Sequence, residues 1–269
     1  MHRSQINLHP VKSCRGISVA SAEIDDCGLV GDHRFLVTMT DGMFITQRKY
    51  PRMALIDTAL APGTLTLSSA GHGGVTVPLD ASHGTHPVVV WKDTVDADDC
   101  GDEAATWLTK FLGMPLRLVR MGAKFHRTVR PSRAKPGDIY TFADGAPFMV
   151  LSESSLADLN ARIVANGGGA LPMNRFRPNF VIAGCAPYAE DTWPHFRLGH
   201  VTFRSVDTCT RCILTTTDQL TAERGKEPLK TLATYRRNKE DPTDVDFGQM
   251  LVHETKRGTV RVGDPVVLL

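Results

Sequence analysis

The chain has 269 residues, 42% of them hydrophobic and 22% charged, with a formal net charge of +2. This length accommodates one large or two small domains, and the weak charge excludes a broad basic surface for nucleic-acid polymers or membranes. No run approaches the roughly 18 apolar residues of a membrane span, and the first residues do not form a secretory signal. Because six cysteines are too few for a disulfide framework, we expect a cytoplasmic protein.

Runs that favour β-strands dominate the first half of the chain. Phe35–Gln47 (FLVTMTDGMFITQ) holds two such runs around Asp41-Gly42, a pattern that predicts a hairpin. Further short strands are expected between Gly63 and Asp99, separated by turns that contain Gly or Pro. The segment DEAATWLTKFLG then repeats apolar residues at helical spacing, and Gly113 predicts the end of that helix.

The second half begins with a basic segment, Lys124–Asp138 (KFHRTVRPSRAKPGD), that contains almost no apolar residue. It predicts an exposed loop, which either connects two elements through solvent or faces an anion or a partner. The helix expected after PFMVLS has Ser152 or Ser154 as its N-cap. Strands are expected in FVIAG, HVTFRSVD and TVRVGDPVVLL, so the whole pattern indicates a β-rich fold with a closed or partly closed barrel.

Cys209 and Cys212 form a Cys-x-x-Cys motif that includes Arg211. A structural zinc site needs four ligands, and neither a second cysteine pair nor a nearby histidine pair accompanies the motif. A redox pair needs a helix after it, whereas ILTTT is β-branched and favours a strand or an extended loop. In a third interpretation, one thiolate binds a thiophilic metal carried by an organic cofactor, and Arg211 keeps that thiolate ionised. The residues alone leave these three interpretations open.

The third interpretation requires a pocket for an anionic cofactor, and basic residues beside short strands are candidates for it. Lys12 and Ser13 lie in a loop after a proline, Arg34 begins a strand, and Arg177 and Asn179 precede another. Cations at the ends of barrel strands suit a phosphate-bearing ligand. Taken separately, each also suits a solvated surface position, with Arg177 paired to an acidic residue of PYAEDTW.

Segments in order along nearly the whole chain resemble one family: HPVKSCRG, GLVGDHRFLV, FITQRKYPRMALI, LSESSLADLN, RFRPNFVIAGCAPYAEDTW, CTRCILTTTD, KEPLKTLATYR and VGDPVVLL. They are similar to the MOSC-domain proteins, named for the C-terminal domain of molybdenum cofactor sulfurases. Within that family the similarity is to the mitochondrial amidoxime reducing component and its bacterial relatives. The combination of RFRPN with C-x-R-C-I-L-T-T is its most specific part.

The resemblance implies a β-rich α+β fold, in which a MOSC β-barrel with flanking helices is joined to an N-terminal β-rich accessory module. We expect a β-barrel-like N-terminal module in residues 1–120 and the MOSC domain in residues 121–269. Residues 1–34 are expected to complete the MOSC barrel, which leaves about 35–120 for the accessory module itself.

The resemblance also implies a bound molybdenum–molybdopterin cofactor (Moco), with Cys212 as catalytic thiolate and metal ligand. The dithiolene of the pterin supplies two further sulfurs. The cofactor contacts that carry over are Lys12, Ser13, Arg34, Asp144, Gly145, Ala146, Arg177, Asn179, Thr210 and Arg211. Gly145 and Ala146 stand where the mitochondrial relatives have hydroxyl residues, so backbone contacts are expected there. Cys209 is either a thiol that tunes the site or a packed residue.

The implied activity is the reduction of N-hydroxylated compounds (amidoximes, hydroxylamines and N-hydroxylated bases) by abstraction of the N–O oxygen at the Cys-ligated molybdenum. His33, His126 and Asp144 lie in or near the pocket segments, but none is identified as the proton donor. A separate electron donor (a flavoprotein reductase, ferredoxin or cytochrome) is expected, because the chain lacks a ferredoxin cluster motif. The basic loop Lys124–Lys135 is a candidate docking surface for it.

A carrier that binds Moco and passes it on without turnover is the alternative to the reductase. Sulfur transfer is disfavoured, because the chain carries no domain of the pyridoxal-phosphate type to mobilise sulfur. The expected partners are therefore a small N-hydroxylated substrate and the electron donor, with no nucleic-acid polymer and no membrane.

Overall fold

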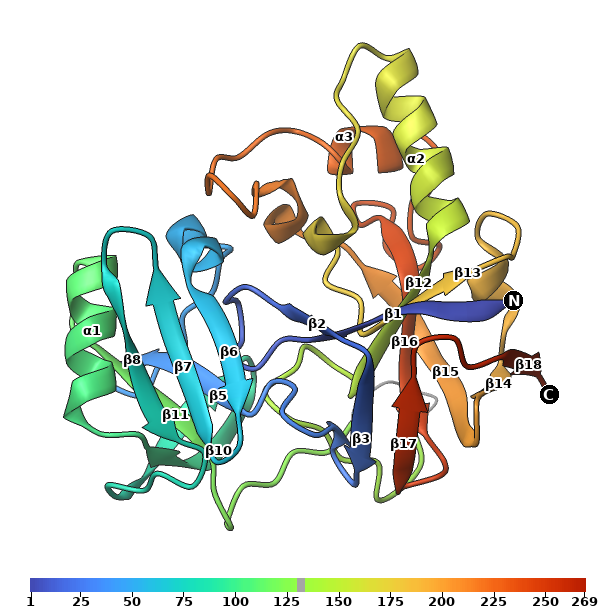
Figure 1. The fold of residues 1–269 in the computed structure, drawn as a ribbon. Coiled ribbons are helices and arrows are strands. Elements are labelled where there is room, and N and C mark those ends of the chain that lie inside the picture. The colour runs from blue at the N-terminus through green and yellow to red at the C-terminus, as the bar shows by residue number, and fades with distance from the viewer. Residues whose placement is uncertain (130–133) are drawn as a thin grey trace.

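A sheet of eight strands joins the first residues of the chain to its second half in the computed structural model, which describes residues 1–129 and 134–269 (Figure 1). The strands lie in the order β18-β14-β15-β16-β12-β13-β1-β2. Their bounds are β1 (His2–Leu8), β2 (Ile17–Val19), β12 (Phe148–Ser152), β13 (Phe180–Ala183), β14 (His195–Leu198), β15 (Val201–Thr210), β16 (Asp246–His253) and β18 (Val266–Leu268). Beside it lies a three-stranded sheet of β17 (Gly258–Arg261), β3 (Ser21–Asp25) and β4 (Gly28–Leu29).

The core of the large sheet is aromatic. Phe148 and Phe180 lie on the neighbouring strands β12 and β13, and Phe203 of β15 meets their rings at centroid distances of 5.2 and 5.3 Å. None of the three is more than 1% exposed. Burial of one such side chain contributes about 1.5–3 kcal/mol, so this cluster fixes the strands whose ends carry the site described below.

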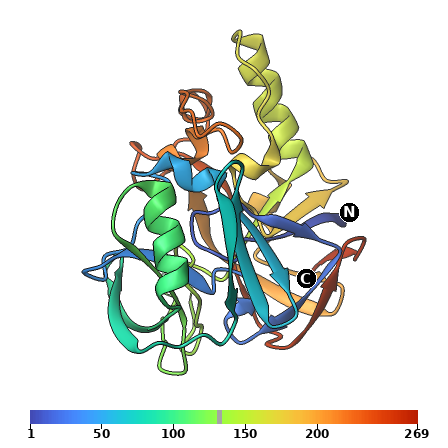
Figure 2. The ribbon, with the colours of Figure 1, turned by 60° about the vertical axis from the view of Figure 1, so that its left-hand side comes forward.

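The middle of the first half forms a second group of strands, at the left in Figure 1. One sheet has the order β5-β11-β10-β9 and another the order β6-β7-β8. Their bounds are β5 (Phe35–Met39), β6 (Asp57–Ala61), β7 (Thr64–Ser69), β8 (Gly73–Pro78), β9 (Thr85–Val90), β10 (Asp93–Asp99) and β11 (Leu116–Met121). Helix α1 (Asp102–Leu112) packs against β8 and β11, on the outer side of this group (Figure 2).

Two helices begin or end where the sequence predicts. Helix α1 ends at Gly113, whose φ of 79° is the left-handed conformation that glycine adopts easily. Helix α2 (Glu153–Ala165) has Ser152 as its N-cap, and the Ser152 hydroxyl accepts a hydrogen bond from the Ser155 N–H at 3.1 Å. Shorter helices are α3 (Leu229–Leu232) and the 3₁₀ segments η1 (Pro51–Leu55), η2 (Met173–Arg175), η3 (Ala189–Thr192) and η4 (Ile213–Thr216).

The predicted fold class, a β-rich α+β protein, is confirmed, but two local predictions are wrong. The Asp41-Gly42 hairpin is confirmed, because Thr38 forms an antiparallel bridge with Phe44 and the Met39 N–H donates to the Met43 carbonyl at 2.8 Å, although the second run is not long enough to form a named strand. The ILTTT segment forms η4, because the hydroxyls of Thr215 and Thr216 bond the carbonyls three residues before them. Within the basic loop, Arg127 is buried at 3% exposure rather than solvated; Arg130 and Arg133 lie outside the described residues.

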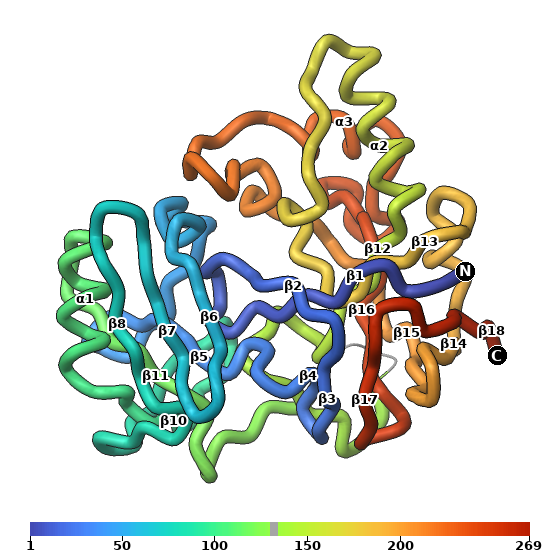
Figure 3. The backbone as a smooth tube through the Cα atoms, viewed as in Figure 1, coloured from blue at the N-terminus to red at the C-terminus, as the bar shows by residue number. Residues whose placement is uncertain are grey.

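The tube in Figure 3 follows the chain from β1 through β2, β3 and β4 into the left-hand group and back to β12. Both termini lie on the side of the large sheet. Within the described parts of the chain, no helix has the length and apolar character needed to cross a membrane.

Candidate functional site

A cavity of about 400 Å³ lies where loops from both halves of the chain meet. Its lining joins the loop after β1, the loop before β12, the segment before β13 and the end of β15. The polar lining residues are Lys12, Ser13, His33, Arg48, Asp144, Arg175, Arg177, Asn179, Cys209, Thr210, Arg211, Cys212, Thr215 and Asp244. A volume of this size suits a small organic ligand or cofactor.

The two cysteines of the Cys-x-x-Cys motif both line this cavity but differ in their surroundings. Cys209 packs against an apolar cluster that includes Phe247, and burial raises the pKa of its thiol, with the charge of Arg211 opposing that rise. Cys212 lies beyond the end of β15, as the residue before η4, and its carbonyl accepts hydrogen bonds from the N–H and the hydroxyl of Thr215 at 3.1 and 2.9 Å. The backbone of Cys212 is therefore held by the turn that follows it.

Arg211 and Thr210 hold the Cys212 segment against the rest of the fold. The Arg211 Nε donates to the Phe247 carbonyl at 2.8 Å, and its Nη2 donates to the Phe176 carbonyl at 3.1 Å. The Thr210 hydroxyl donates to an Asp246 carboxylate oxygen at 3.2 Å. These side-chain contacts connect the end of β15 to β16 and η2, so both residues position the cavity wall.

Lys12 is a buried cation at the cavity. Its Nζ donates to the Phe142 carbonyl at 2.7 Å and pairs with the Asp144 carboxylate. Burial lowers the pKa of Lys12, while Asp144 opposes that change. Burial would raise the pKa of Asp144, but the charge and hydrogen bond of Lys12 and a hydrogen bond from Trp91 hold it well below its usual range. Lys12 and Asp144 therefore stabilise each other's charged forms.

Arg177 is a buried cation of the cavity with one unused donor. Its Nη1 donates to the Cys14 carbonyl at 2.6 Å, whereas its buried Nη2 has no hydrogen-bond partner among the residues that the structure describes. Burial lowers the pKa of this guanidinium. The anticipated surface ion pair is wrong, because Asp191 pairs with Arg236 and Glu190 accepts bonds from Ser152 and Ser155. A buried guanidinium with a free donor favours an anion beside it.

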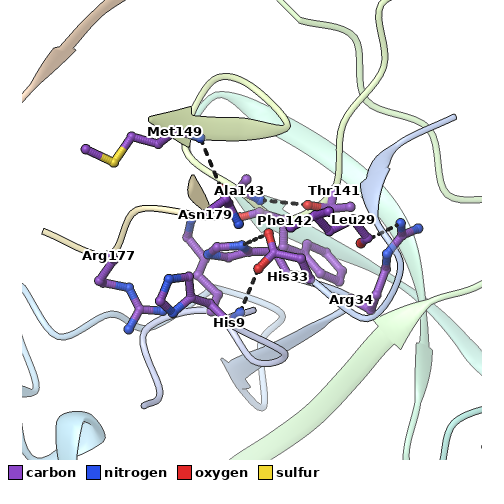
Figure 4. A network of polar contacts seen from close by, with 12 residues as sticks. His9, Leu29, His33, Arg34, Thr141, Phe142, Ala143, Met149, Arg177 and Asn179 are labelled. Carbon is purple, nitrogen blue, oxygen red and sulfur yellow. Dashed lines mark hydrogen bonds and ion pairs between the residues drawn. The ribbon is translucent and has the colours of Figure 1, made fainter. Parts of the chain in front are cut away.

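A histidine and aspartate network lies behind Arg177 (Figure 4). The Asp32 carboxylate accepts the His9 backbone N–H at 2.6 Å and contacts the His33 Nδ1 at 2.7 Å. Burial, reinforced by the charge of Arg177, places the pKa of His9 well below its usual value. His33 lines the cavity, whereas His126 is exposed and does not. Asp32 thus orients the imidazole that faces the cavity.

The structure does not bring Arg34 to this cavity. Its Nη2 donates to both carboxylate oxygens of Asp25, at 2.7 and 2.9 Å, and to the Leu29 carbonyl at 3.2 Å. It lines a second cavity, of about 430 Å³. In Figure 4, Arg34 and Arg177 lie on opposite sides of the His9–His33 pair. The Asp25 carboxylate explains this placement, because it satisfies Arg34 outside the first cavity.

The other predicted residues lie in or beside the first cavity. Asn179 lines it while its amide joins β1 to β12, with the side-chain oxygen accepting the Met149 N–H at 3.0 Å and Nδ2 donating to the Asn7 carbonyl at 3.2 Å. Ser13, Asp144 and Ala146 line it directly. Gly145 stands between two lining residues without lining the cavity itself.

Sequence reasoning missed three charged lining residues, Arg48, Arg175 and Asp244. Arg175 stands in the same RFRPN segment as Arg177, which was the available signal, whereas Arg48 comes from the other group of strands. Within residues 1–129 and 134–269, no three His, Cys, Asp or Glu side chains form a group that could hold a metal ion. A metal bound at Cys212 therefore needs further ligands from an organic cofactor.

Comparison with known protein families and sequences agrees with this architecture. The model of the MOSC N-terminal beta barrel domain matches residues 2–115, and that of the MOSC domain matches residues 137–267. The mitochondrial amidoxime-reducing component 1 of Homo sapiens is 38% identical over 288 residues, which cover 99% of this chain and 82% of that protein. Component 2 of Bos taurus is 38% identical over 282 residues, covering 98% and 82%.

A third relative is a longer protein. The molybdenum cofactor sulfurase of Danio rerio is 32% identical over 272 residues, which cover 94% of this chain but 32% of the sulfurase. Two MOSC-type domains covering most of one β-rich chain define a MOSC-domain protein. The chain belongs to this family, together with the mitochondrial amidoxime-reducing components, and the resemblance inferred from its motifs is confirmed.

Proposed function

We propose that this protein is a molybdenum-cofactor-dependent reductase of N-hydroxylated compounds, in which the Cys212 thiolate is the protein ligand of the metal. The observation that carries the proposal is the shared cavity of Cys212 and Arg177, a thiol that can bind a soft metal and a buried guanidinium with a free donor. The names of the relatives support amidoxime reduction as the activity. When bound, the cofactor supplies two-electron oxygen-atom chemistry at molybdenum.

The cavity residues suit a pterin phosphate and its polar ring edges. Among the described residues, the buried Nη2 of Arg177 has no partner. The buried Nζ of Lys12 makes two contacts, one with the Phe142 carbonyl and one with the Asp144 carboxylate. We assign these two residues to the anionic groups of the cofactor, with Ser13 beside Lys12. A phosphate accepts several such charge-assisted hydrogen bonds, which are stronger than those between neutral groups.

The remaining site residues keep the thiol and the cations in place. The side chains of Arg211 and Asn179 donate hydrogen bonds to backbone carbonyls. We therefore assign both residues to holding the cavity wall in place. Asp32 holds His33 at the cavity, where a ring N–H can deliver a proton to a departing amine or amidine nitrogen. Arg34 has no part in this assignment.

Turnover on a molybdenum-loaded sample tests the proposal. With a chemical reductant, the protein should convert benzamidoxime to benzamidine, and metal and pterin should be present in equal amounts. Cys212→Ser should abolish conversion while the circular dichroism and the unfolding midpoint stay close to those of the wild type. Cys209→Ser is the matched control, because it removes the other thiol of the same motif and should keep most of the activity.

Two outcomes contradict this assignment. Activity retained in Cys212→Ser would remove that thiolate as the metal ligand. No conversion at full molybdenum occupancy would favour a Moco carrier over a reductase. In the reductase, reducing equivalents come from a separate redox protein that the chemical reductant replaces in this assay.

A further inference from the structure

One cavity cation comes from the opposite group of strands and is exposed. Arg48 lies between β5 and η1, and its backbone is fixed from two sides: Arg224 donates to the Gln47 and Arg48 carbonyls, and the Arg48 N–H bonds the Thr46 hydroxyl at 3.2 Å. The side chain lines the cavity that holds Cys212. Exposure places Arg48 at the mouth of this cavity, whereas Lys12 is 2% exposed.

Trp91 holds the Arg48 side chain in this position. The guanidinium lies over the indole ring, 4.4 Å from its centroid, which is the geometry of a cation–π contact. Phe44 packs edge-on against the same ring at 4.8 Å, and the indole Nε1 donates to Asp144 at 2.7 Å. The Trp91 ring is thus held by contacts with Phe44 and Asp144, and its face supports the Arg48 side chain beside the cavity.

The backbone of Trp91 indicates that this placement has a function. Trp91 begins the two-residue turn between Val90 and Asp93 with a φ of 58°, in the left-handed region. Turns of this kind favour glycine, asparagine or aspartate, and a bulky side chain there is strained. Such strain persists where the surrounding contacts over-determine it, and it concentrates at functional sites.

The Arg48 guanidinium has no ion pair in the described part of the chain. Its charge nevertheless contributes to the lowered pKa of Asp144. That carboxylate is already bonded by Lys12 and Trp91. Arg175, by contrast, is paired with Asp218 at 2.8 Å. The exposed Asp244 is the opposing charge of the lining, and it too has no ion pair among the described residues.

We propose that Arg48, positioned by Trp91, makes this enzyme select N-hydroxylated substrates that carry a carboxylate remote from the N–O group. This inference rests on the proposed reductase function and adds the substrate class to it. The deep cations Lys12 and Arg177 are assigned to the cofactor, so Arg48 is an exposed cavity cation without an ion pair among the described residues that an entering substrate meets. A guanidinium that lies over an aromatic ring can still use its N–H groups for bidentate bonding to a carboxylate.

A pair of matched ligands tests the proposal without turnover. Benzamidoxime and 4-carboxybenzamidoxime share the N–O group and differ by the carboxylate. Their dissociation constants are measured by calorimetry on the molybdenum-loaded protein without reductant. The wild type should bind the carboxylate form more tightly, and Arg48→Gln should reduce this preference about fivefold. Added salt should weaken the wild-type preference, because the contact is exposed.

Arg52→Gln is the matched control. Arg52 stands in the same segment and also lies over an aromatic ring, that of Phe111 at 4.9 Å, but it does not line the cavity. Its substitution makes the same charge change and should leave the preference intact. Equal binding of both ligands by the wild type, or the same loss in both variants, would overturn the proposal.

Trp91 variants separate positioning from folding. Trp91→Phe keeps an aromatic face and removes the Nε1 donor, so it should retain the preference for the carboxylate. Trp91→Leu removes the face and should lose it, at unchanged molybdenum content. A loss of preference in both variants would mean that the bond to Asp144, and not the stacking of Arg48, carries the effect. The turnover assay tests the reductase proposal separately from these binding measurements, because that proposal fails if the molybdenum-loaded protein does not convert benzamidoxime.

Discussion

Arg177 offers the sharpest test of the candidate site, because its substitution should act in opposite directions on stability and on cofactor retention. Arg177→Gln removes a buried cation whose Nη1 makes one bond, to the Cys14 carbonyl, and whose Nη2 has no partner in residues 1–129 and 134–269. Leaving such a donor buried and unsatisfied costs about 1–3 kcal/mol, and the bond that is lost contributes about 1 kcal/mol. The cofactor-free variant should therefore be as stable as the wild type, or more stable by about 1 kcal/mol.

Retention of the cofactor should fall in the same variant. A charge-assisted hydrogen bond to an anion contributes about 1.5–3 kcal/mol, which corresponds to a roughly 10- to 150-fold weaker complex. Urea unfolding of the cofactor-free protein measures the first effect. The ratio of molybdenum to protein after gel filtration, together with the cofactor release rate, measures the second.

Arg175→Gln is the control, because this neighbouring arginine forms an ion pair and a carbonyl bond through its two terminal nitrogens, although its buried Nε has no partner among the described residues. Its Nη1 donates to the Thr216 carbonyl at 2.9 Å and its Nη2 to Asp218 at 2.8 Å. Its removal should destabilise the cofactor-free protein by about 1–2 kcal/mol, since it breaks satisfied bonds. If Arg177→Gln instead destabilises the protein like Arg175→Gln and leaves molybdenum content unchanged, Arg177 is a structural residue and the reasoning fails.

Two further substitutions test buried titratable side chains that do not line the cavity, His253 and Arg127. Burial, helped by the charge of Lys256, lowers the pKa of His253 from 6.5 to about 4, so the unfolded chain is protonated first as pH falls. The stability that this neutral imidazole contributes is complete above about pH 6.5, and about 3 kcal/mol of it is lost as the pH falls toward 4. Urea unfolding should show this loss in the wild type and not in His253→Gln. An equal loss in both proteins would contradict the prediction. Arg127→Met should lower the free energy of unfolding by about 3 kcal/mol, because its guanidinium bonds the Tyr140 hydroxyl and the Thr141 and Ala143 carbonyls; a change below about 0.5 kcal/mol contradicts it.

Elements with local signals could be predicted from the sequence. Helix α1 follows from apolar spacing and a glycine stop, and α2 begins at Ser152 because a hydroxyl there satisfies the free N–H of Ser155. The runs from Thr64 to Asp99 became strands because their alternating pattern matches the pleat. In each case the deciding interaction lies within a few residues of the signal.

Elements decided by distant partners could not be predicted in this way. The run after Gly42 pairs with the other edge of β5 only as far as Ile45, and the Gln47 side chain then turns inward to the Ser13 carbonyl at 2.7 Å. Arg34 and Arg48 are both basic residues near strand ends. Arg34 forms an ion pair with Asp25 outside the cavity, whereas Arg48 lies over the ring of Trp91 and lines the cavity. Which cation is left without a carboxylate depends on contacts between segments, which composition does not reveal.

The RFRPN segment shows how backbone geometry gives two neighbouring arginines different surroundings. Arg175 and Arg177 are two residues apart, so a continuous strand would place both on one face. The 3₁₀ turn η2 instead aims Arg175 at Asp218, and Arg177 then adopts a φ of 55°, before Pro178, which disfavours the right-handed helical conformation for its predecessor. Asn179 fixes the other side of this bend, since its N–H bonds the Met149 carbonyl at 2.9 Å and its side-chain oxygen accepts the Met149 N–H. Arg177 therefore lines the cavity because the chain is bent and fixed there, and its Nη2 has no hydrogen-bond partner within the described residues.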